Sequence, residues 1–347
     1  MQPLKILNIL ICLLLTFALS AQDSSFESFP NNDYQLLKKQ RTIALKGIVN
    51  IPLSCFVIRD SVLLVNEFTN KPGEFLISFW SLKSGNKLGA AIPVGRGPGE
   101  HLPPLELHVS MDTVELWDQN RGNYSVQYIT KNLELIEISE RGKFTGLTGH
   151  LINLNNAFIG SSRGDNKYHL SVYNKTGTKV INRVKYFDFE PLNRLDPALQ
   201  HHLMDGCYIK HPSKPWLAFA GFITPFFVIY NVNDPQNIET TFEYSLRKDV
   251  TITDSYNQGG VRFLTLAKDE PKGARSPVST NQYLYYLYLG VSPDNANSEN
   301  ILKINWNGRF ENGYKLDEEI VIFTIHKGKI YAIDGFWENI MVYEMNP

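Results

Sequence analysis

The sequence contains little cysteine. Of its 347 residues only three are cysteine. Cys12 lies in an N-terminal apolar segment, which leaves Cys55 and Cys207 for the rest of the chain. Two cysteines exclude the dense disulfide framework that stabilises small secreted domains. Both are flanked by apolar residues, so buried free thiols are the simpler interpretation, and a single bridge between them is the alternative.

An excess of charge of either sign is also missing. The 34 basic and 35 acidic side chains leave a formal net charge of -1. A nucleic-acid-binding protein carries a basic face and a high isoelectric point, so this balance excludes nucleic acid as the partner. With 43% hydrophobic and 20% charged residues, the composition also differs from that of disordered chains.

Long apolar runs are absent except at the N-terminus. The run Ile6–Leu19 is shorter than the roughly 20 residues that a membrane-spanning helix needs. Lys5 precedes it and small residues up to Ala21 follow it, which is the pattern of a secretory signal peptide. We therefore expect a signal peptide over residues 1–21 and no membrane span. The mature domain, residues 22–347, is expected to be periplasmic or secreted.

Two common motifs of metal and redox enzymes are missing. The chain has no His-Glu-x-x-His and no Cys-x-x-Cys sequence. A non-catalytic function is therefore favoured over an enzymatic one.

A pair of apolar, β-rich segments recurs along the whole chain. The first segments of the pairs are Val62–Val65, Val114–Trp117, Ala157–Ile159, Trp216–Phe219, Tyr283–Leu287 and Ile330–Ile333. The second segments are Phe75–Phe79, Tyr124–Tyr128, His169–Tyr173, Phe226–Tyr230, Ile301–Ile304 and Ile340–Tyr343. Turns containing Gly, Asn or Asp, the first of them Ser84-Gly85, follow the second segments, as hairpins require. Such a repeat of short strands predicts a β-propeller.

The repeats predict an all-β fold with six blades. The expected blades cover residues 51–92, 105–140, 147–184, 203–246, 258–317 and 319–347. Polar insertions, one of them around Lys268–Thr280, lengthen the fifth repeat. The sixth repeat ends too early to supply its own outer strand. We therefore expect residues 40–46 to pair beside Ile340–Tyr343, which closes the ring and protects a sheet edge. A single helix is expected over Pro191–Leu203, and a two-domain β-sandwich is the alternative fold.

A glycine-rich step links the first two expected blades. It reads Val94-Gly-Arg-Gly-Pro-Gly-Glu100 and is followed by a strand and Leu116-Trp-Asp118. With six blades behind a signal peptide, this motif resembles the TolB-like six-bladed propellers of secreted bacterial proteins. Trp306-Asn-Gly308 and Tyr314-Lys-Leu-Asp317 resemble the penultimate blade of that family. The resemblance implies an exported β-propeller and no particular reaction, because a fold does not fix a function.

The glycines of this step have two interpretations. They supply unusual φ angles to a structural turn, or they bring Arg96 and Glu100 to a ligand. A nucleotide-binding loop is excluded, because Glu100-His-Leu-Pro-Pro104 follows in place of Lys-Ser/Thr, and two prolines are incompatible with a helix interior.

Charged and aromatic side chains fall in loops that share one face of a propeller. The connections between blades and the turns between second and third strands emerge at the same mouth of the channel. The side chains expected there are Arg96, Glu100, Asp118, Arg121, Arg163, Asp165 and Trp337. We expect this charged rim to bind a protein, peptide or glycan of the cell envelope without a cofactor. The alternative is that these loops are polar because water surrounds them.

Carboxylate and amide groups at strand ends allow a second function. Some six-bladed propellers are calcium- or zinc-dependent lactonases with such a cluster in the channel. The corresponding side chains here are Asn66, Glu67, Asp118 and Asp334, each at the end of an expected innermost strand. On this hypothesis the chain is a metal-dependent hydrolase that holds Ca or Zn through oxygen ligands.

Overall fold

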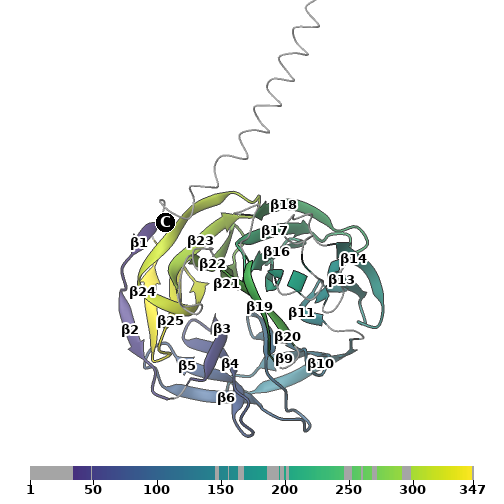
Figure 1. The fold of residues 1–347 in the computed structure, drawn as a ribbon. Helices are drawn as coiled ribbons and strands as arrows, with labels where there is room; N and C mark the ends of the chain where they lie inside the picture. The colour runs from purple at the N-terminus through teal and green to yellow at the C-terminus, as the bar shows by residue number, and fades with distance from the viewer. Residues whose placement is uncertain are drawn as a thin grey trace, which may run out of the picture.

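The structure is a computed structural model in which the strands form a ring of antiparallel sheets (Figure 1). It describes residues 34–47, 49–144, 148–154, 156–162, 168–185, 195, 199–200, 203–245, 252–258, 261–267, 272–290 and 298–345. The signal-peptide prediction for residues 1–21 lies outside them. The ring confirms the prediction of an all-β propeller.

Blades 1 to 4 are separate four-stranded sheets. Blade 1 consists of β3 (Ile51–Ile58), β4 (Val62–Phe68), β5 (Phe75–Ser81) and β6 (Lys87–Pro93), and blade 2 of β7 (Leu105–Ser110), β8 (Thr113–Asp118), β9 (Asn123–Ile129) and β10 (Leu135–Lys143). Blade 3 consists of β11 (Thr148–Asn153), β12 (Ala157–Ser162), β13 (Tyr168–Asn174) and β14 (Val180–Lys185), and blade 4 of β15 (Gly206–Lys210), β16 (Trp216–Gly221), β17 (Phe226–Asn231) and β18 (Glu239–Ser245).

Blades 5 and 6 share one long strand, β24 (Phe310–His326). It pairs with β23 through Phe310–Lys315 and with β25 through Ile320–His326, so its two ends belong to different blades. Blade 5 begins with β21 (Lys272–Ser279), β22 (Tyr283–Gly290) and β23 (Ser298–Asn305), and β1 (Gln35–Leu37) pairs in parallel with β24 at its outer edge. Blade 6 continues with β25 (Lys329–Asp334) and β26 (Asn339–Glu344), and β2 (Arg41–Ala44) completes it.

The pairing of β2 with β26 closes the ring. Ile43 lies opposite Ile340 and Arg41 opposite Val342 in an antiparallel register. In Figure 1 the purple N-terminal strands accordingly lie beside the yellow C-terminal strands. This confirms the prediction that an N-terminal segment supplies the outer strand of the last blade.

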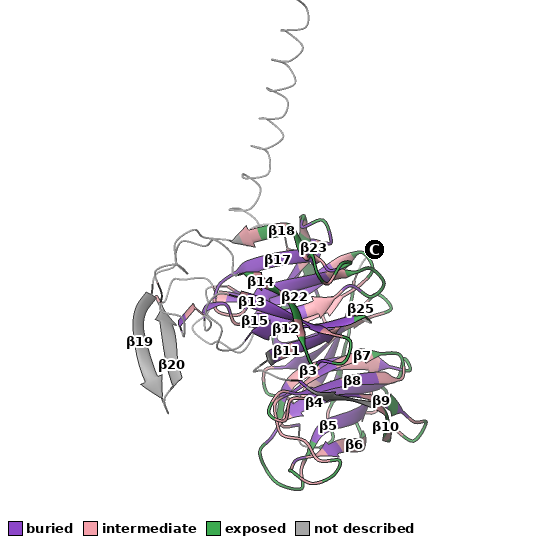
Figure 2. Ribbon diagram, turned by 90° about the vertical axis from the view of Figure 1, so that its right-hand side faces the viewer, coloured by how far each residue is buried: buried purple, intermediate pink, exposed green. Residues whose placement is uncertain are grey.

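The apolar core is divided among the interfaces between neighbouring blades. Six clusters of buried side chains occupy the interfaces 1–2, 2–3, 3–4, 4–5, 5–6 and 6–1. Because a middle strand packs against a blade on each side, β13 and β17 are buried almost throughout, whereas β14 and β18 at the outer edge are half-buried or exposed (Figure 2). This explains why the middle strands carry the apolar repeat of the sequence.

One predicted turn shows why glycine is required. Gly85, in the turn between β5 and β6, has a φ of +70°. A Cβ atom there would lie 1.9 Å from the backbone oxygen of Ala44, at the end of β2. The Gly85 carbonyl also accepts a hydrogen bond from the Lys46 N–H at 2.8 Å. Glycine therefore lets the closing segment approach blade 1 closely.

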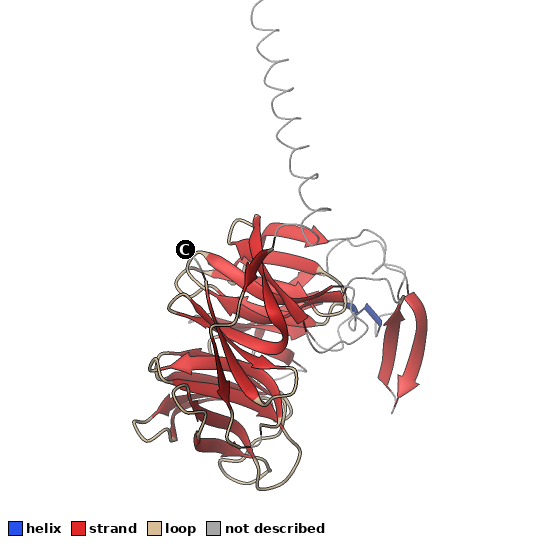
Figure 3. Cartoon of the chain, turned by 90° about the vertical axis from the view of Figure 1, so that its left-hand side faces the viewer, coloured by secondary structure: helices blue, strands red, loops and turns tan. Residues whose placement is uncertain are grey.

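Blade 5 differs from the sequence prediction at its inner edge. The polar segment expected as an insertion around Lys268–Thr280 contains β21, the innermost strand. A separate hairpin of β19 (Ile252–Gln258) and β20 (Val261–Leu266) precedes it and projects from one face of the ring (Figures 1 and 3). An innermost strand borders the open channel, so it can be polar, and Pro277 is tolerated where the register of β21 shifts between Arg275 and Val278.

Two further expectations concern the helix and the cysteines. Most of Pro191–Leu203 lies outside the described residues, although Leu199 and Leu203 are helical and pack between blades 3 and 4. No helix in the described part of the chain has the length and apolar character that spanning a bilayer demands.

Cys55 and Cys207 are free and buried in different interfaces, which confirms the free-thiol interpretation.

Closure can be tested by placing a charge in β2. Ile43 is 6% exposed and packs between blades 6 and 1. An Ile43→Asp variant buries a carboxylate at the seam, and we expect it to lower the free energy of unfolding by roughly 3 kcal/mol or more. Thr42→Asp is the control, because Thr42 is exposed on the other face of the same strand. Thermal unfolding of the two variants should differ strongly. Equal melting temperatures would mean that β2 does not hold the ring closed.

Candidate functional site

The loop face carries most of the predicted rim. We define it as the face formed by the connections between blades and the turns between second and third strands. Arg96 and Glu100 lie in the β6–β7 connection, Arg121 follows β8, and Trp337 lies in the β25–β26 turn. Arg163 and Asp165 are outside the described residues. The structure thus brings Arg96, Glu100 and Arg121 close together and places Trp337 on the same face.

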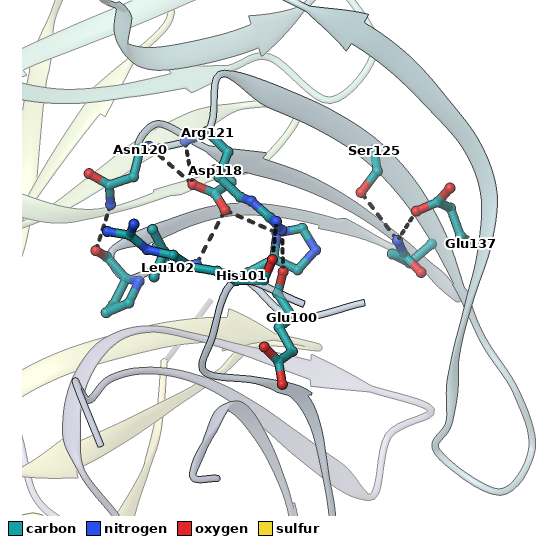
Figure 4. A network of polar contacts seen from close by, with 11 residues as sticks. Glu100, His101, Leu102, Asp118, Asn120, Arg121, Ser125 and Glu137 are labelled. Atoms are coloured by element: carbon teal, nitrogen blue, oxygen red, sulfur yellow. Dashed lines mark hydrogen bonds and ion pairs between the residues drawn. The ribbon is translucent and has the colours of Figure 1, made fainter. Parts of the chain in front are cut away.

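Asp118 at the end of β8 is the centre of this region (Figure 4). Its side chain is fully buried. Oδ1 accepts hydrogen bonds from the backbone N–H groups of Asn120 and Arg121, both at 3.0 Å. Oδ2 accepts one from the Leu102 N–H at 3.2 Å and lies 3.2 Å from His101 Nδ1. The carboxylate therefore joins the β8–β9 turn to the β6–β7 connection.

The pKa of Asp118 reflects these bonds. Burial raises the pKa of the carboxyl group, but the hydrogen bonds from His101, Leu102 and Arg121 outweigh burial, so the pKa lies below its ordinary value. The charged form is therefore the stable one in the folded protein.

Arg121 and Glu100 shape the glycine-rich loop from within. The Arg121 guanidinium donates to the Glu100 carbonyl at 2.6 Å and to the Arg96 carbonyl at 2.7 Å. Oε2 of Glu100 accepts a hydrogen bond from the Gly97 N–H at 2.6 Å. A Cβ atom at Gly95 would lie 2.0 Å from the same oxygen, so the glycines make room for this carboxylate. Both charged side chains are thus engaged in the loop's own structure.

Arg96 and the blade 6 turn present free groups on the loop face. Arg96 is exposed, and its guanidinium forms no hydrogen bond or ion pair with another described residue. In the β25–β26 turn Trp337 packs partly onto the cluster between blades 6 and 1, whereas the neighbouring Phe336 is 84% exposed. Arginine and aromatic side chains of this kind are enriched in protein interfaces.

The proposed metal ligands lie on second strands, which corrects the expectation of innermost strands. Asn66 and Glu67 lie near the end of β4 and Asp334 ends β25, each one strand away from the channel-lining strand of its blade. This follows because the apolar repeat marks the doubly covered middle strands, whereas the innermost strands are more polar.

The carboxylates of this set are bonded to neighbouring loops. Glu67 accepts hydrogen bonds from the N–H and side-chain amide of Asn50 and from the hydroxyl of Ser78. Asp334 accepts from the N–H groups of Glu338 and Asn339 and from the Asn339 amide at 2.7 Å. Within the described ranges no group of three or more His, Cys, Asp or Glu side chains is placed to hold a metal ion. The Ca or Zn hydrolase hypothesis therefore gains no support from this arrangement.

A serine motif on blade 3 also has a structural explanation. Gly160–Gly164 matches the pattern Gly-x-Ser-x-Gly, which marks a nucleophile when the serine stands on a strand-to-helix turn. Here Ser162 is the last residue of β12 and is buried, and its hydroxyl lies 2.6 Å from that of Ser171 on β13. The serine therefore joins two strands of one blade.

The central channel forms a cavity of about 1720 Å³. It is bordered by the innermost strands of all six blades, β3, β7, β11, β15, β21 and the second half of β24. Charged and imidazole side chains from blades 2 to 4 reach its wall, among them Glu106, His108, Glu115, His150 and Lys210.

Glu106 and His150 connect blades 2 and 3 at this wall. Nδ1 of His150 lies 3.2 Å from Glu106 Oε1, and the Leu151 N–H donates to Oε2 at 2.9 Å. Nε2 of His108 lies 3.7 Å from the same Oε1. Burial raises the pKa of Glu106, but His150, His108 and the Leu151 N–H outweigh it, so the pKa lies below its ordinary value. Burial lowers the pKa of His108, and Glu106 offsets this in part.

A second charge pair lies farther along the same wall. Lys210 Nζ of blade 4 lies 3.2 Å from Glu115 Oε1 of blade 2. Glu115 stands opposite His108 in the β7–β8 ladder. The two pairs thus make one side of the channel polar, while the outer part of the same 2–3 interface is filled by aromatic rings such as Trp117 and Phe144.

The sequence prediction missed this cluster. A signal was present in Leu105-Glu-Leu-His-Val-Ser110, where polar residues occupy every second position of a strand. Such alternation places Glu106 and His108 on one face and the leucines on the other. The partners on blades 3 and 4 are distant in sequence, so the pattern alone did not reveal them.

Comparison with known proteins identifies relatives of the fold. A family model described as TolB-like 6-blade propeller-like matches residues 27–328. A presumed exported protein from Bacteroides fragilis has 12% sequence identity and a TM-score of 0.54, over 90% of this chain and 99% of that one. A member of the DUF4221 family from Bacteroides vulgatus has 10% identity and a TM-score of 0.56, over 90% of this chain and 98% of that one. No match was found among curated proteins. Identities this low establish the fold alone.

The role of Asp118 predicts a pH-dependent loss of stability. Asp118→Asn keeps one acceptor oxygen and loses the other, and we expect it to lower the free energy of unfolding at pH 7 by about 2 kcal/mol. Because the folded pKa is depressed, the stability due to the charge is present above the unfolded pKa of about 4 and is lost as pH falls through the folded pKa. The difference between wild type and Asp118→Asn should therefore shrink toward pH 3.

Thermal unfolding at a series of pH values checks this. Asp112→Asn is the control, because Asp112 pairs with Arg59 at 2.7 Å on the surface and contributes little. A difference between wild type and Asp118→Asn that stays constant down to pH 3 would contradict the assigned role of the Asp118 charge.

Proposed function

This chain belongs to the TolB-like family of six-bladed propellers, and we propose that it is an exported, non-catalytic binding module. Its partner is a protein, peptide or glycan of the cell envelope. Export is supported by the apolar segment Ile6–Leu19 with its basic and small flanking residues, and by the description of the Bacteroides fragilis relative as a presumed exported protein.

The observation that carries the proposal is the braced position of Arg96. Arg121 fixes the loop that bears Arg96 by donating hydrogen bonds to two of its carbonyl groups. Asp118 accepts hydrogen bonds from the N–H groups of Leu102 and Arg121, and so joins this loop to the β8–β9 turn. Because the backbone of this loop is braced, the loop itself loses little conformational freedom when a ligand binds, which favours affinity. Arg96 itself is exposed and has no partner among the described residues, so it is available to a carboxylate or sulfate of a partner.

An exposed aromatic group on the same face adds to the surface. Phe336 is 84% exposed, and the turn that bears it is tied to β25 by Asp334. A phenyl ring on this held turn can contribute apolar contact area to a protein partner or stack on a sugar ring. The loop face therefore offers one cationic and one aromatic contact, both on loops held by buried carboxylates.

Glu100, Arg121 and Asp118 serve this surface as supports. Their charged groups bond to the loops themselves, so replacing them would change the loop before it changed a ligand contact. Tests of binding should therefore leave these residues in place and alter Arg96 and Phe336.

Binding through the loop face can be tested with two pairs of variants. Arg96→Ala and Phe336→Ser remove the proposed contacts. Arg309→Ala and Met111→Ser remove an exposed arginine and an exposed apolar side chain from turns on the opposite face. Mature protein is offered to a glycan array and to detergent-solubilised envelope proteins of the producing cell, and each captured partner is titrated with every variant.

We expect the two loop-face variants to weaken binding at least about tenfold, which corresponds to about 1.4 kcal/mol each. The opposite-face variants should bind as the wild type does. A partner that binds Arg96→Ala and Phe336→Ser with wild-type affinity, or that responds to Met111→Ser instead, would show that the loop face is not the binding surface.

A further inference from the structure

A compact group of polar side chains lies on one wall of the channel. Glu106 and His108 lie on β7, and Glu115 stands opposite His108 on β8. His108 Nε2 lies 3.7 Å from Glu106 Oε1, and Lys210 Nζ of blade 4 lies 3.2 Å from Glu115 Oε1. All four side chains border the cavity, and each is between 16% and 33% exposed. They are therefore neighbours on a single wall and within reach of one small ligand group.

Buried polar atoms without a hydrogen-bond partner gather around the same strand. Among the described residues these include His108 Nε2, Trp117 Nε1 and Asn66 Oδ1. Trp117 stands opposite Glu106 in the β7–β8 ladder, and the Asn66 amide donates to the Leu105 carbonyl at the start of β7 at 2.9 Å. All three residues border the cavity, and Trp117 and Asn66 are each 2% exposed. Because buried polar groups normally have partners, this strand calls for hydrogen bonds that the described chain does not supply.

The charges on this wall already face partners. Glu106 Oε1 lies 3.2 Å from His150 Nδ1, and the Leu151 N–H donates to Oε2 at 2.9 Å. Glu115 is paired with Lys210. A ligand carboxylate would face two carboxylates here, and a ligand ammonium group would compete with the ammonium group of Lys210. An uncharged ligand that both donates and accepts hydrogen bonds therefore suits the wall best.

We propose that this wall is a second binding site, which takes a neutral oligosaccharide whose hydroxyl groups bond to Glu106, His108, Glu115 and Lys210. A hydroxyl group donates to a carboxylate and accepts from an ammonium or imidazole N–H, so adjacent hydroxyls of one sugar ring match adjacent groups of the wall. Hydrogen bonds to charged groups are stronger than those between neutral groups. We call these four residues the β7 wall. The site lies inside the channel, so it is separate from the loop face and does not depend on it.

The size of the channel favours an oligosaccharide over a single sugar. Its volume of about 1720 Å³ exceeds the roughly 300–1,000 Å³ of ordinary small-molecule pockets. One sugar unit on the β7 wall leaves much of this space to water, whereas further units of the same chain can occupy it and contact the rest of the lining. No single unit then has to reach the opposite wall.

The proposal is tested by calorimetric titration of the mature protein with neutral hexasaccharides of maltose, xylan, mannan and laminarin type. Hexagalacturonate is the acidic counterpart. We expect at least one neutral hexasaccharide to bind, and hexagalacturonate to bind at least tenfold more weakly. His108→Phe keeps a ring but loses both ring nitrogens, so it should weaken binding of the neutral sugar at least tenfold. His326→Phe is the matched control and should bind as the wild type does, because His326 ends β24 and pairs with Asp60 on the surface.

A double variant decides if His108→Phe does not fold. Glu115→Gln with Lys210→Met removes both members of an ion pair, which costs less stability than removing one, and it should also weaken binding at least tenfold. Failure of all four neutral hexasaccharides to bind at about 1 mM would overturn the proposal. Equal or tighter binding of hexagalacturonate, or unchanged binding by both β7-wall variants, would do the same.

Arg96→Ala separates this site from the loop face. It should bind the hexasaccharide as the wild type does, whatever its effect on an envelope partner. A hexasaccharide that Arg96→Ala binds at least tenfold more weakly would lie on the loop face, and the channel site would be wrong.

Discussion

The structure depends on burying both faces of every blade. A four-stranded sheet with apolar middle strands is stable only when another layer covers each face, and here each blade covers its two neighbours. The first and last blades are covered on both faces only if they pack against each other. The β2–β26 ladder makes that junction, with Ile43 and Ile340 both in the cluster between blades 6 and 1. Closure therefore stabilises an interface of the core as well as a sheet edge.

The same constraint leaves the innermost strands free to be polar. The middle strands provide most of the apolar contacts between blades, so residues at the channel are not required to be hydrophobic. This permits Glu106, His108 and Arg275 to line the cavity. It also accounts for β21, whose polar sequence with Pro277 looks like an insertion but forms the inner edge of blade 5. In the 2–3 interface the division is visible, because aromatic rings fill the outer part and charged pairs the channel side.

Buried carboxylates connect this core to the loop face in a repeated way. Glu67, Asp118 and Asp334 each stand at or near the end of a second strand, and each accepts hydrogen bonds from backbone N–H groups of adjacent loops. Each carboxylate thereby ties a short loop to its blade. The loops that bear exposed groups such as Arg96 and Phe336 are therefore held in place on the loop face. The acids themselves are engaged in this support. The exposed groups that they position form no such bonds with the loops.

The sequence by itself determined the number of blades, the closing strand and the turn at Gly85, because these follow from local apolar runs and from backbone conformations that few residues adopt. It also placed Arg96, Glu100, Asp118 and Arg121 on one face, since strand order fixes where connections emerge. Only the tertiary structure decided that Asp118 and Arg121 hold the loop while Arg96 stays exposed. Likewise, only the ring brings Glu106 to His150 and Glu115 to Lys210. Those pairs join different blades far apart in the chain, and side-chain direction and burial at such contacts are set by packing rather than by neighbouring residues.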